Sequence, residues 1–158
     1  MTGIETSAQP AFREAQAEDA ELLLELMREF TATQTYLFKE IAARHSLHEL
    51  LASPTLGRVW VIESRGSAVG YIVLTFGFSL EYGGRDAFVD EFFVRSLHRG
   101  GGLGRAALSF VLGQAACLGV RAVHLEVDRV NLAAHQLYQS LGFEGNDRHL
   151  LTKRLHAG

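Results

Sequence analysis

The sequence predicts an α/β (α+β) fold, in which a mixed, mostly antiparallel central sheet of about six to seven strands carries helices on both faces. Three observations lead to this prediction. The chain has 158 residues, 47% of them hydrophobic, which suits one domain with a substantial core. Apolar residues recur at helical spacing before residue 53 and at strand-like spacing after residue 58. The last part of the chain alternates between strand-like and helix-like segments.

The N-terminal third is expected to contain one strand and two helical regions. A short strand over Phe12–Ala15 precedes a helix over Glu18–Phe30, in which apolar residues repeat every three or four positions. A second helical region over Tyr36–Ala52 is expected in two pieces, because Ser46 and Glu49 have the spacing of a capping box.

The rest of the chain is predicted to supply most of the sheet. A hairpin is expected from Val59–Glu63 and Val69–Phe78, which flank a Ser-Arg-Gly-Ser turn, and Phe88–Val94 is expected to be the next strand. The later elements are expected to be a helix over Arg105–Leu118, a strand over Arg121–Val127, a helix over Asn131–Leu141 and a final strand over Leu150–Leu155.

Composition argues against several classes of protein. The net charge of −3 and the pI of about 6.1 do not suit a nucleic-acid-binding domain. A single cysteine, Cys117, rules out an internal disulfide and fits a cytoplasmic protein. No apolar run is long enough to span a membrane. Residues 1–9 are expected to be a flexible leader and residues 10–158 a single domain.

Four glycines stand within six residues immediately before a predicted helix, in the stretch RGGGLGRAAL from Arg99 to Leu108. The first turn of a helix offers unpaired N–H groups and the positive end of its dipole, which together attract phosphate. Glycine lets a ligand approach the backbone closely, and Arg99 and Arg105 add positive charge. The stretch therefore predicts a phosphate-binding loop.

Two nucleotide-binding motifs are alternatives for this loop. No Gly-Lys-Ser/Thr ends the stretch, so it is not a P-loop. Residues 102–107 do match the dinucleotide-binding pattern G-x-G-x-x-A, with Glu126 or Asp128 at a suitable distance for a ribose contact. Against this, five residues, 95–99, separate the first glycine from the preceding strand, and only thirty residues follow Asp128. A nicotinamide nucleotide is therefore the weaker prediction.

The stretch instead resembles the pyrophosphate loop, Arg/Gln-x-x-Gly-x-Gly/Ala, of the GNAT superfamily of acetyl-CoA-dependent N-acetyltransferases. Residues 131–143 match the second signature of that family, N-x-x-A-x-x-x-Y-x-x-x-G-F, and the resemblance covers about residues 12–155. Phe88–Val94 is similar to the matching strand of diamine (spermidine/spermine) and thialysine acetyltransferases. The resemblance implies direct acetyl transfer from acetyl-CoA, without a metal, to a primary amine of a small cationic acceptor such as a polyamine or a lysine-like amino acid.

The resemblance also implies which residues hold acetyl-CoA. The backbone of Phe92, Phe93 and Val94 is expected to pair with the pantetheine amides, and Asn131 and Ala134 are expected to contact the co-substrate. The expected pyrophosphate-binding residues are Arg99, Gly100, Gly101, Gly102, Leu103, Gly104 and Arg105. A CoA-binding module without catalysis, or an enzyme that acetylates protein lysines or N-terminal amines, remains an alternative.

Acetyl transfer requires the acceptor ammonium to lose a proton and the leaving thiolate to gain one. Tyr138 is the expected acid, and its alternative role is that of a core tyrosine. Glu91, directly or through water, is the expected base. Asp90 and Glu91 should alternate faces along a strand, so they are not expected to act as a pair. Asp90 is expected to bind the substrate instead, and so is Glu126. His124 and Asp128 are further candidates.

Three further features of the sequence lead to smaller expectations. His45 and His48 lie three residues apart on a predicted helix, but two histidines without a third ligand do not predict a metal site. Cys117 is expected in the core. The aromatic strand end Phe76-Gly77-Phe78 is expected to form an apolar patch, which favours a homodimer.

Overall fold

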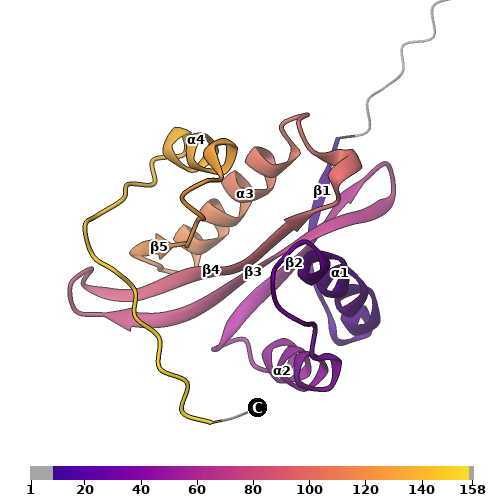
Figure 1. Cartoon of the computed structure of the whole chain (residues 1–158), viewed down its shortest axis with the longest axis horizontal. Coiled ribbons are helices and arrows are strands. Elements are labelled where there is room, and N and C mark those ends of the chain that lie inside the picture. The colour runs from indigo at the N-terminus through magenta and orange to yellow at the C-terminus, as the bar shows by residue number, and fades with distance from the viewer. Residues whose placement is uncertain (1–8, 157–158) are drawn as a thin grey trace, which may run out of the picture. The chain divides into compact units, whose positions relative to one another are not determined.

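Strands that follow one another in the sequence are also neighbours in the sheet, whose order is β1-β2-β3-β4-β5 (Figure 1). Neighbouring strands from β1 to β4 are antiparallel, and β5 pairs in parallel with β4. The strands are β1 (Ala11–Glu14), β2 (Gly57–Ser64), β3 (Ser67–Ser79), β4 (Gly84–Val94) and β5 (Ala122–His124). The predicted mixed sheet is confirmed, with five strands rather than six or seven.

The computed structural model describes residues 9–156, so residues 1–8 of the predicted leader lie outside the described part. The chain divides into two compact units, residues 1–125 and residues 126–158. The first unit holds the whole sheet, and the second holds the last helix. Among the described residues, no helix is both long enough and apolar enough to cross a membrane.

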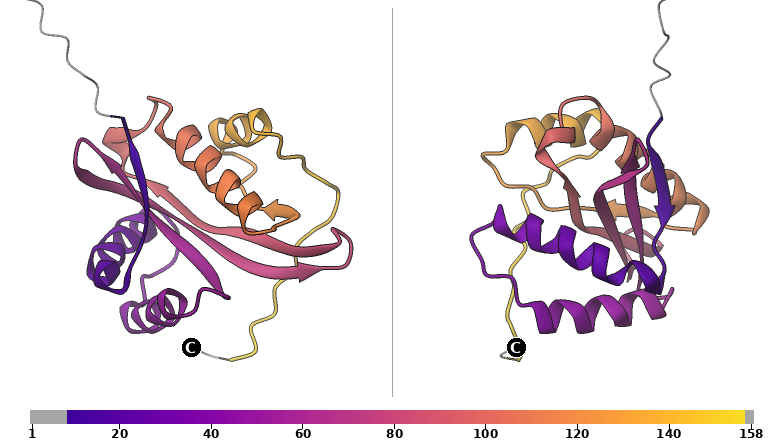
Figure 2. Two further views of the ribbon diagram at one scale, coloured as in Figure 1. Left: turned by 180° about the vertical axis from the view of Figure 1, so that it is seen from behind. Right: turned by 90° about the vertical axis from the view of Figure 1, so that its right-hand side faces the viewer.

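Helices of the first unit cover both faces of its sheet (Figures 1 and 2). A short 3-10 turn, η1 (Ala17–Asp19), leads into α1 (Ala20–Ala32), and α1 lies beside α2 (Glu40–Ala52) on one face. The opposite face carries α3 (Leu103–Cys117), which follows the 3-10 turn η2 (Ser96–His98). Helices on both faces were predicted, and this prediction is confirmed.

A separate apolar cluster lies on each face of the sheet. Beneath α1 and α2, fully buried Leu23 and Leu26 pack with Val61 and Tyr71 of the sheet. On the α3 face, the cluster consists of Ile62, Val69, Val94 and Ala107. Side chains of a strand alternate between the two faces, so one sheet can supply both clusters. Tyr71 and Phe93 therefore lie on the α1–α2 face, and Val94 lies on the α3 face.

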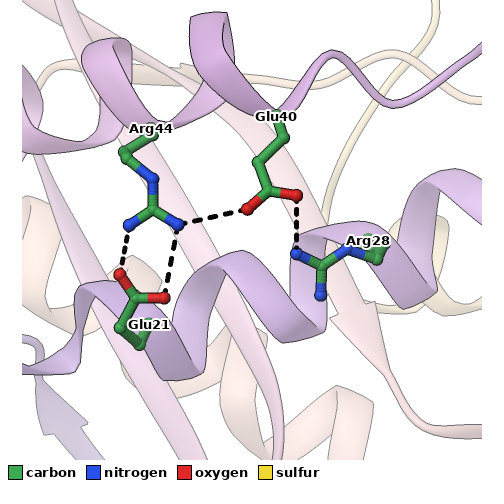
Figure 3. Close-up of polar contacts among 4 residues, drawn as sticks. All are labelled: Glu21, Arg28, Glu40 and Arg44. Carbon is green, nitrogen blue, oxygen red and sulfur yellow. Dashed lines mark hydrogen bonds and ion pairs between the residues drawn. The ribbon is translucent and has the colours of Figure 1, made fainter.

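Four charged side chains connect α1 to α2 at the surface (Figure 3). Arg44 of α2 donates to both carboxylate oxygens of Glu21 of α1, and it also donates to Glu40 at 3.1 Å. Arg28 of α1 donates to Glu40 at 3.0 Å. These hydrogen bonds lower the pKa of Glu21 and of Glu40. Solvent screens such exposed pairs, so each of them contributes little to stability.

The second unit contains α4 (Leu132–Ser140), as predicted, but not the predicted final strand. Residues 150–155 form no regular structure, and Leu150, Leu151 and Leu155 are exposed. A strand needs a neighbouring edge for its backbone hydrogen bonds, and apolar residues alone do not supply one. The strand over Leu150–Leu155 was therefore a wrong prediction.

Several local predictions also need correction. The second helical region is one continuous helix, so Ser46 lies inside α2 and caps nothing. Helix α3 begins at Leu103, two residues earlier than predicted. Cys117, expected in the core, is exposed, because it lies on the outer side of the last turn of α3. Of the expected apolar patch, Phe78 is exposed but Phe76 lies under the Arg85 guanidinium at 4.5 Å. The homodimer stays a prediction.

Candidate active site

A β-bulge interrupts β4 at Asp90. Val73 of β3 lies opposite Glu91, while the next residue, Leu74, lies opposite Val89, so Asp90 has no partner in the register. An extra residue of this kind breaks the alternation of side chains along a strand. Asp90 and Glu91 consequently line the same cavity. The prediction that they face opposite sides was wrong, because alternation was assumed for a strand that contains a bulge.

Tyr71 of β3 holds the Glu91 carboxylate. The Tyr71 hydroxyl is fully buried and donates to Oε2 of Glu91 at 3.0 Å. Burial, followed by the charge of Glu91, raises the pKa of Tyr71 far above its ordinary value, so the hydroxyl remains a donor. A buried tyrosine hydroxyl needs a hydrogen-bond partner, and here that partner is the acid on the neighbouring strand.

Burial controls the ionisation of both carboxylates on β4. It raises the pKa of Glu91, while the hydrogen bond from Tyr71 opposes this rise and the charge of Asp90 adds to it. Burial also raises the pKa of Asp90, although part of this side chain is open to solvent. Tyr36, which follows α1, lies close enough for both acids to raise its pKa, after the larger effect of burial. A carboxylate with a raised pKa is a stronger base, as proton abstraction from an amine requires.

The cavity that these acids line has a volume of about 150 Å³ and lies between the sheet, α1 and α2. Its lining includes exposed Ser46 and Asp90 and partly exposed Met27, Ala43 and Leu50, whereas Leu23, Val59 and Tyr71 are at most 2% exposed and lie behind this surface. Apart from Ser46, Tyr71 and the two acids, all of the described lining residues are apolar. The cavity therefore combines two carboxyl groups with an apolar wall.

The glycine stretch forms the turn that leads into α3. Gly100 and Gly102 both have φ of +85°, a left-handed conformation that favours glycine, and Gly102 is the N-cap of the helix. Gly101 has no such constraint, and a Cβ added at residues 100–102 would meet no atom within 4 Å. Among the described residues of the first unit, no contact requires a glycine at position 101, and neither does its φ. The open space above it is what a phosphate needs in order to reach the backbone at the start of a helix.

Two arginines flank this loop, as predicted. The Nε of Arg99 donates to the carbonyl oxygen of Val94 at 2.6 Å, and its guanidinium lies 5.6 Å from the centre of the Phe93 ring. Arg99 thus connects the loop to the end of β4. Arg105 is exposed on the first turn of α3. A hollow of about 340 Å³ adjoins the loop and includes Phe93 and Arg99 in its lining.

One edge of β4 lacks a strand partner near the loop. β5 pairs with β4 only from Asp86 to Phe88, so among the described residues of the first unit no strand pairs with this edge over residues 89–94. Phe92, Phe93 and Val94 belong to this stretch. Unpaired backbone groups at a sheet edge can bind an extended ligand that carries amides, because such a ligand supplies the missing donors and acceptors.

The second unit holds the other predicted residues. Asn131 is the N-cap of α4, and its side-chain oxygen accepts from the Ala134 backbone N–H at 3.1 Å. Near the end of the helix, the Tyr138 ring packs edge-on against Phe143, with ring centres 5.9 Å apart. Burial raises the pKa of Tyr138, so its hydroxyl is protonated at neutral pH. Glu126 belongs to this unit as well, whereas Asp90, Glu91 and the glycine stretch belong to the first.

The sequence did not lead us to expect Tyr71 or the cavity as parts of the site. A tyrosine inside the apolar run Val69-Gly70-Tyr71-Ile72-Val73 was a usable signal, because a buried hydroxyl implies a polar partner nearby. The cavity had no signal in the sequence, since its lining comes from two helices and three strands. Among the described residues, no group of three possible metal ligands exists, and His45 and His48 have no third ligand near them.

Comparison with known proteins identifies the family of this chain. The model of the Acetyltransferase (GNAT) family matches residues 20–143, so the chain belongs to the GNAT family of acetyltransferases. No curated protein matches the sequence. An integron cassette protein from the mobile metagenome of Cole Harbour Salt Marsh is 42% identical, and the match covers 93% of this chain and 91% of that one with a TM-score of 0.83.

Two further solved structures were determined with CoA ligands. A predicted acetyltransferase from Clostridium acetobutylicum, solved with acetyl-CoA, is 16% identical over 94% of this chain and 100% of its own, with a TM-score of 0.78. AAC(6')-Iy, in complex with the bisubstrate analogue CoA-S-monomethyl-acetylneamine, is 17% identical over 93% of this chain and 99% of its own, with a TM-score of 0.79. At these identities the likeness shows the fold alone.

Proposed function

We propose that this chain transfers an acetyl group from acetyl-CoA directly to the primary amine of a small acceptor that arrives as a cation. The observation that carries the proposal is the Glu91 carboxylate, which lines a cavity with Asp90, is held by the Tyr71 hydroxyl, and lies on the strand that leads to the glycine loop. Membership in the GNAT family supplies the class of reaction.

The first unit offers contacts for both halves of acetyl-CoA. The open loop at Gly100–Gly104, with Arg99 and Arg105 beside it, suits the pyrophosphate, since a helix N-terminus favours anions. The unpaired edge of β4 over Phe92–Val94 suits the amides of pantetheine. The Val94 carbonyl already accepts from Arg99, so Arg99 also fixes the backbone that would meet the ligand. From the second unit, we assign Asn131 and Ala134 to the same ligand, as the signature implies.

We assign proton transfer to Glu91 and, as the family signature implies, to Tyr138. The Glu91 carboxylate takes a proton from the acceptor ammonium, directly or through water, and so frees the nitrogen lone pair for attack on the thioester carbon. A C–N bond forms as the C–S bond breaks, and the Tyr138 hydroxyl gives its proton to the leaving thiolate. The raised pKa of Glu91 suits a base, and the protonated state of Tyr138 suits an acid. Asp90 and Glu126 attract the cationic acceptor.

Thiol release from acetyl-CoA tests the proposal. The purified protein is incubated with acetyl-CoA and a panel of primary amines, and free CoA thiol is measured over time. The matched variant is Glu91→Gln, which keeps the shape of the side chain and can still accept from Tyr71. We expect turnover with the parent and a loss of roughly 10²-fold or more with the variant, in the range of general-base contributions. Equal rates for parent and variant would remove Glu91 from the mechanism.

Calorimetry with CoA and NAD separates the alternatives. Tight binding of CoA without turnover on any amine, peptide lysine or N-terminal amine would indicate a CoA-binding module that uses the fold without catalysis. Binding of NAD but not of CoA would favour the dinucleotide interpretation of Gly102–Ala107. The polyamine or lysine-like acceptor suggested by the resemblance of Phe88–Val94 is one arm of the amine panel.

A further inference from the structure

From the cavity beneath α1 and α2, we infer that the acceptor is a monoamine with a compact apolar body: its ammonium group meets Asp90 and Glu91, and its hydrocarbon body lies against Met27, Ala43 and Leu50, the apolar lining residues that are partly exposed. This inference rests on the proposed acetyl transfer and names the class of substrate for that reaction.

The charges around the cavity select the head group. Among the described residues, Asp90 and Glu91 line it and no lysine or arginine does, so an ammonium group is favoured over a carboxylate or a phosphate. The Tyr71 hydroxyl already donates to one oxygen of Glu91, which leaves the other oxygen for the ammonium. This places the reacting nitrogen against the residue assigned as the base.

The interior of the cavity selects the body. Met27, Ala43 and Leu50 are the partly exposed apolar side chains of this lining, and Leu23, Leu47, Val59 and Val73 are buried behind them. These apolar side chains offer no strong hydrogen-bond partner to a polar group. A second ammonium carried on the same chain would enter this interior without a counter-charge, which is strongly unfavourable. A hydroxyl-rich acceptor would be desolvated there for the same reason. The cavity therefore discriminates against the polyamines that the strand resemblance suggests.

The volume of the cavity limits the size of the body. A dry apolar cavity of about 150 Å³ in another protein accommodates benzene, so the present volume of about 150 Å³ suits a body of roughly six carbon atoms. Amines of the size of hexylamine or benzylamine fit this limit. The cavity does not accommodate a whole aminoglycoside or a folded protein segment.

A series of linear amines from propylamine to octylamine tests the inference in two ways. First, kcat/KM is measured by thiol release. Second, amine binding to the protein–CoA complex is measured by calorimetry. Each methylene buried in the cavity should raise kcat/KM and affinity about fourfold, and the increase should stop near six carbons. 1,6-Diaminohexane should be at least tenfold poorer than hexylamine. No dependence on chain length, or a diamine as good as the monoamine, would overturn the inference.

Two alanines on α2 provide a matched pair of variants. Ala43 lines the cavity, whereas the neighbouring Ala42 is exposed and does not. Leucine is a good helix former, so both Ala43→Leu and Ala42→Leu should fold. We expect Ala43→Leu to stop the increase at a shorter amine, and Ala42→Leu to leave the series unchanged. An identical series for Ala43→Leu and the parent would place the amine elsewhere.

The two readouts separate failure of this inference from failure of the proposed function. Amine binding that depends on chain length, without thiol release, would support the cavity and contradict catalysis. Thiol release that is independent of chain length would support catalysis and contradict the cavity.

Discussion

Gly101 offers the sharpest test of the phosphate-binding loop, because a side chain at this position should leave the fold intact. Its φ is outside the left-handed region, and a Cβ would meet no atom within 4 Å. Replacement of a surface residue without such constraints usually changes stability by less than about 0.5 kcal/mol. A loss of CoA affinity in folded Gly101→Val would therefore reflect an obstructed ligand contact and not a loss of stability.

The expected loss of affinity follows from the backbone donors that a valine would obstruct. A hydrogen bond to a charged group contributes about 1.5–3 kcal/mol, and each 1.4 kcal/mol is a tenfold change in affinity. Obstruction of one amide–phosphate contact should thus weaken CoA binding by roughly 10- to 150-fold. Calorimetry with CoA measures the affinity, and urea unfolding measures the stability of the same sample.

Two further glycines make the comparison specific. Gly113 is exposed in the middle of α3, has no positive φ, and has equal room for a Cβ, so Gly113→Val is the control that should bind CoA like the parent. Gly102→Val should lose affinity and also stability, by about 1–2 kcal/mol, because its φ of +85° is unfavourable for valine. CoA affinity within twofold of the parent for folded Gly101→Val would refute the assignment of the loop.

Three other predictions concern the proton-transfer residues. Tyr138→Phe should lower turnover roughly 10²-fold with little change in CoA affinity, and a variant as active as the parent would return Tyr138 to a packing role. Tyr71→Phe removes the hydrogen bond that lowers the pKa of Glu91. The acid limb of the kcat/KM profile should therefore move to higher pH. If this limb does not move, Glu91 is not the titrating base. Because burial raises the pKa of Glu91, its ionisation destabilises the folded state as the pH rises above the ordinary carboxyl range. Glu91→Gln should therefore melt at a higher temperature than the parent at pH 7, and the difference in melting temperature should shrink towards pH 4. A melting temperature below that of the parent at pH 7 would contradict this prediction.

Periodicity predicted the helix that buries one face. The predicted helix over Glu18–Phe30 overlaps α1, since its apolar residues repeat every three or four positions. The predicted strand over Phe88–Val94 overlaps β4, although its apolar residues do not alternate. Leu150–Leu155 had suitable residues for a strand, but pairing with another strand is a property of the tertiary structure. Propensity was therefore no guide to whether this strand would form.

The site was predictable only in part, for a related reason. The glycine stretch has a local physical explanation, so its place at the head of α3 followed from the sequence. The shared orientation of Asp90 and Glu91 depends on a bulge defined by pairing with β3, and the cavity depends on where α2 packs. Both of these arise between segments that are distant in the chain, so neither has a signature within a short window of residues.

The bulge at Asp90 divides β4 into two halves of opposite phase. Val89 pairs with Leu74 and Glu91 pairs with Val73. Val89 and Glu91 therefore lie on opposite faces of the sheet, whereas residues two apart in a regular strand lie on the same face. Deletion of Asp90 would leave Val89 directly before Glu91, in the register that both residues already have opposite Leu74 and Val73, so the strand would become regular and its other side chains would keep their faces. The extra residue therefore adds a second carboxylate beside Glu91 without changing the packing of the rest of β4. Protein engineers who wish to alter the acceptor can remove this carboxylate by deletion as well as by substitution.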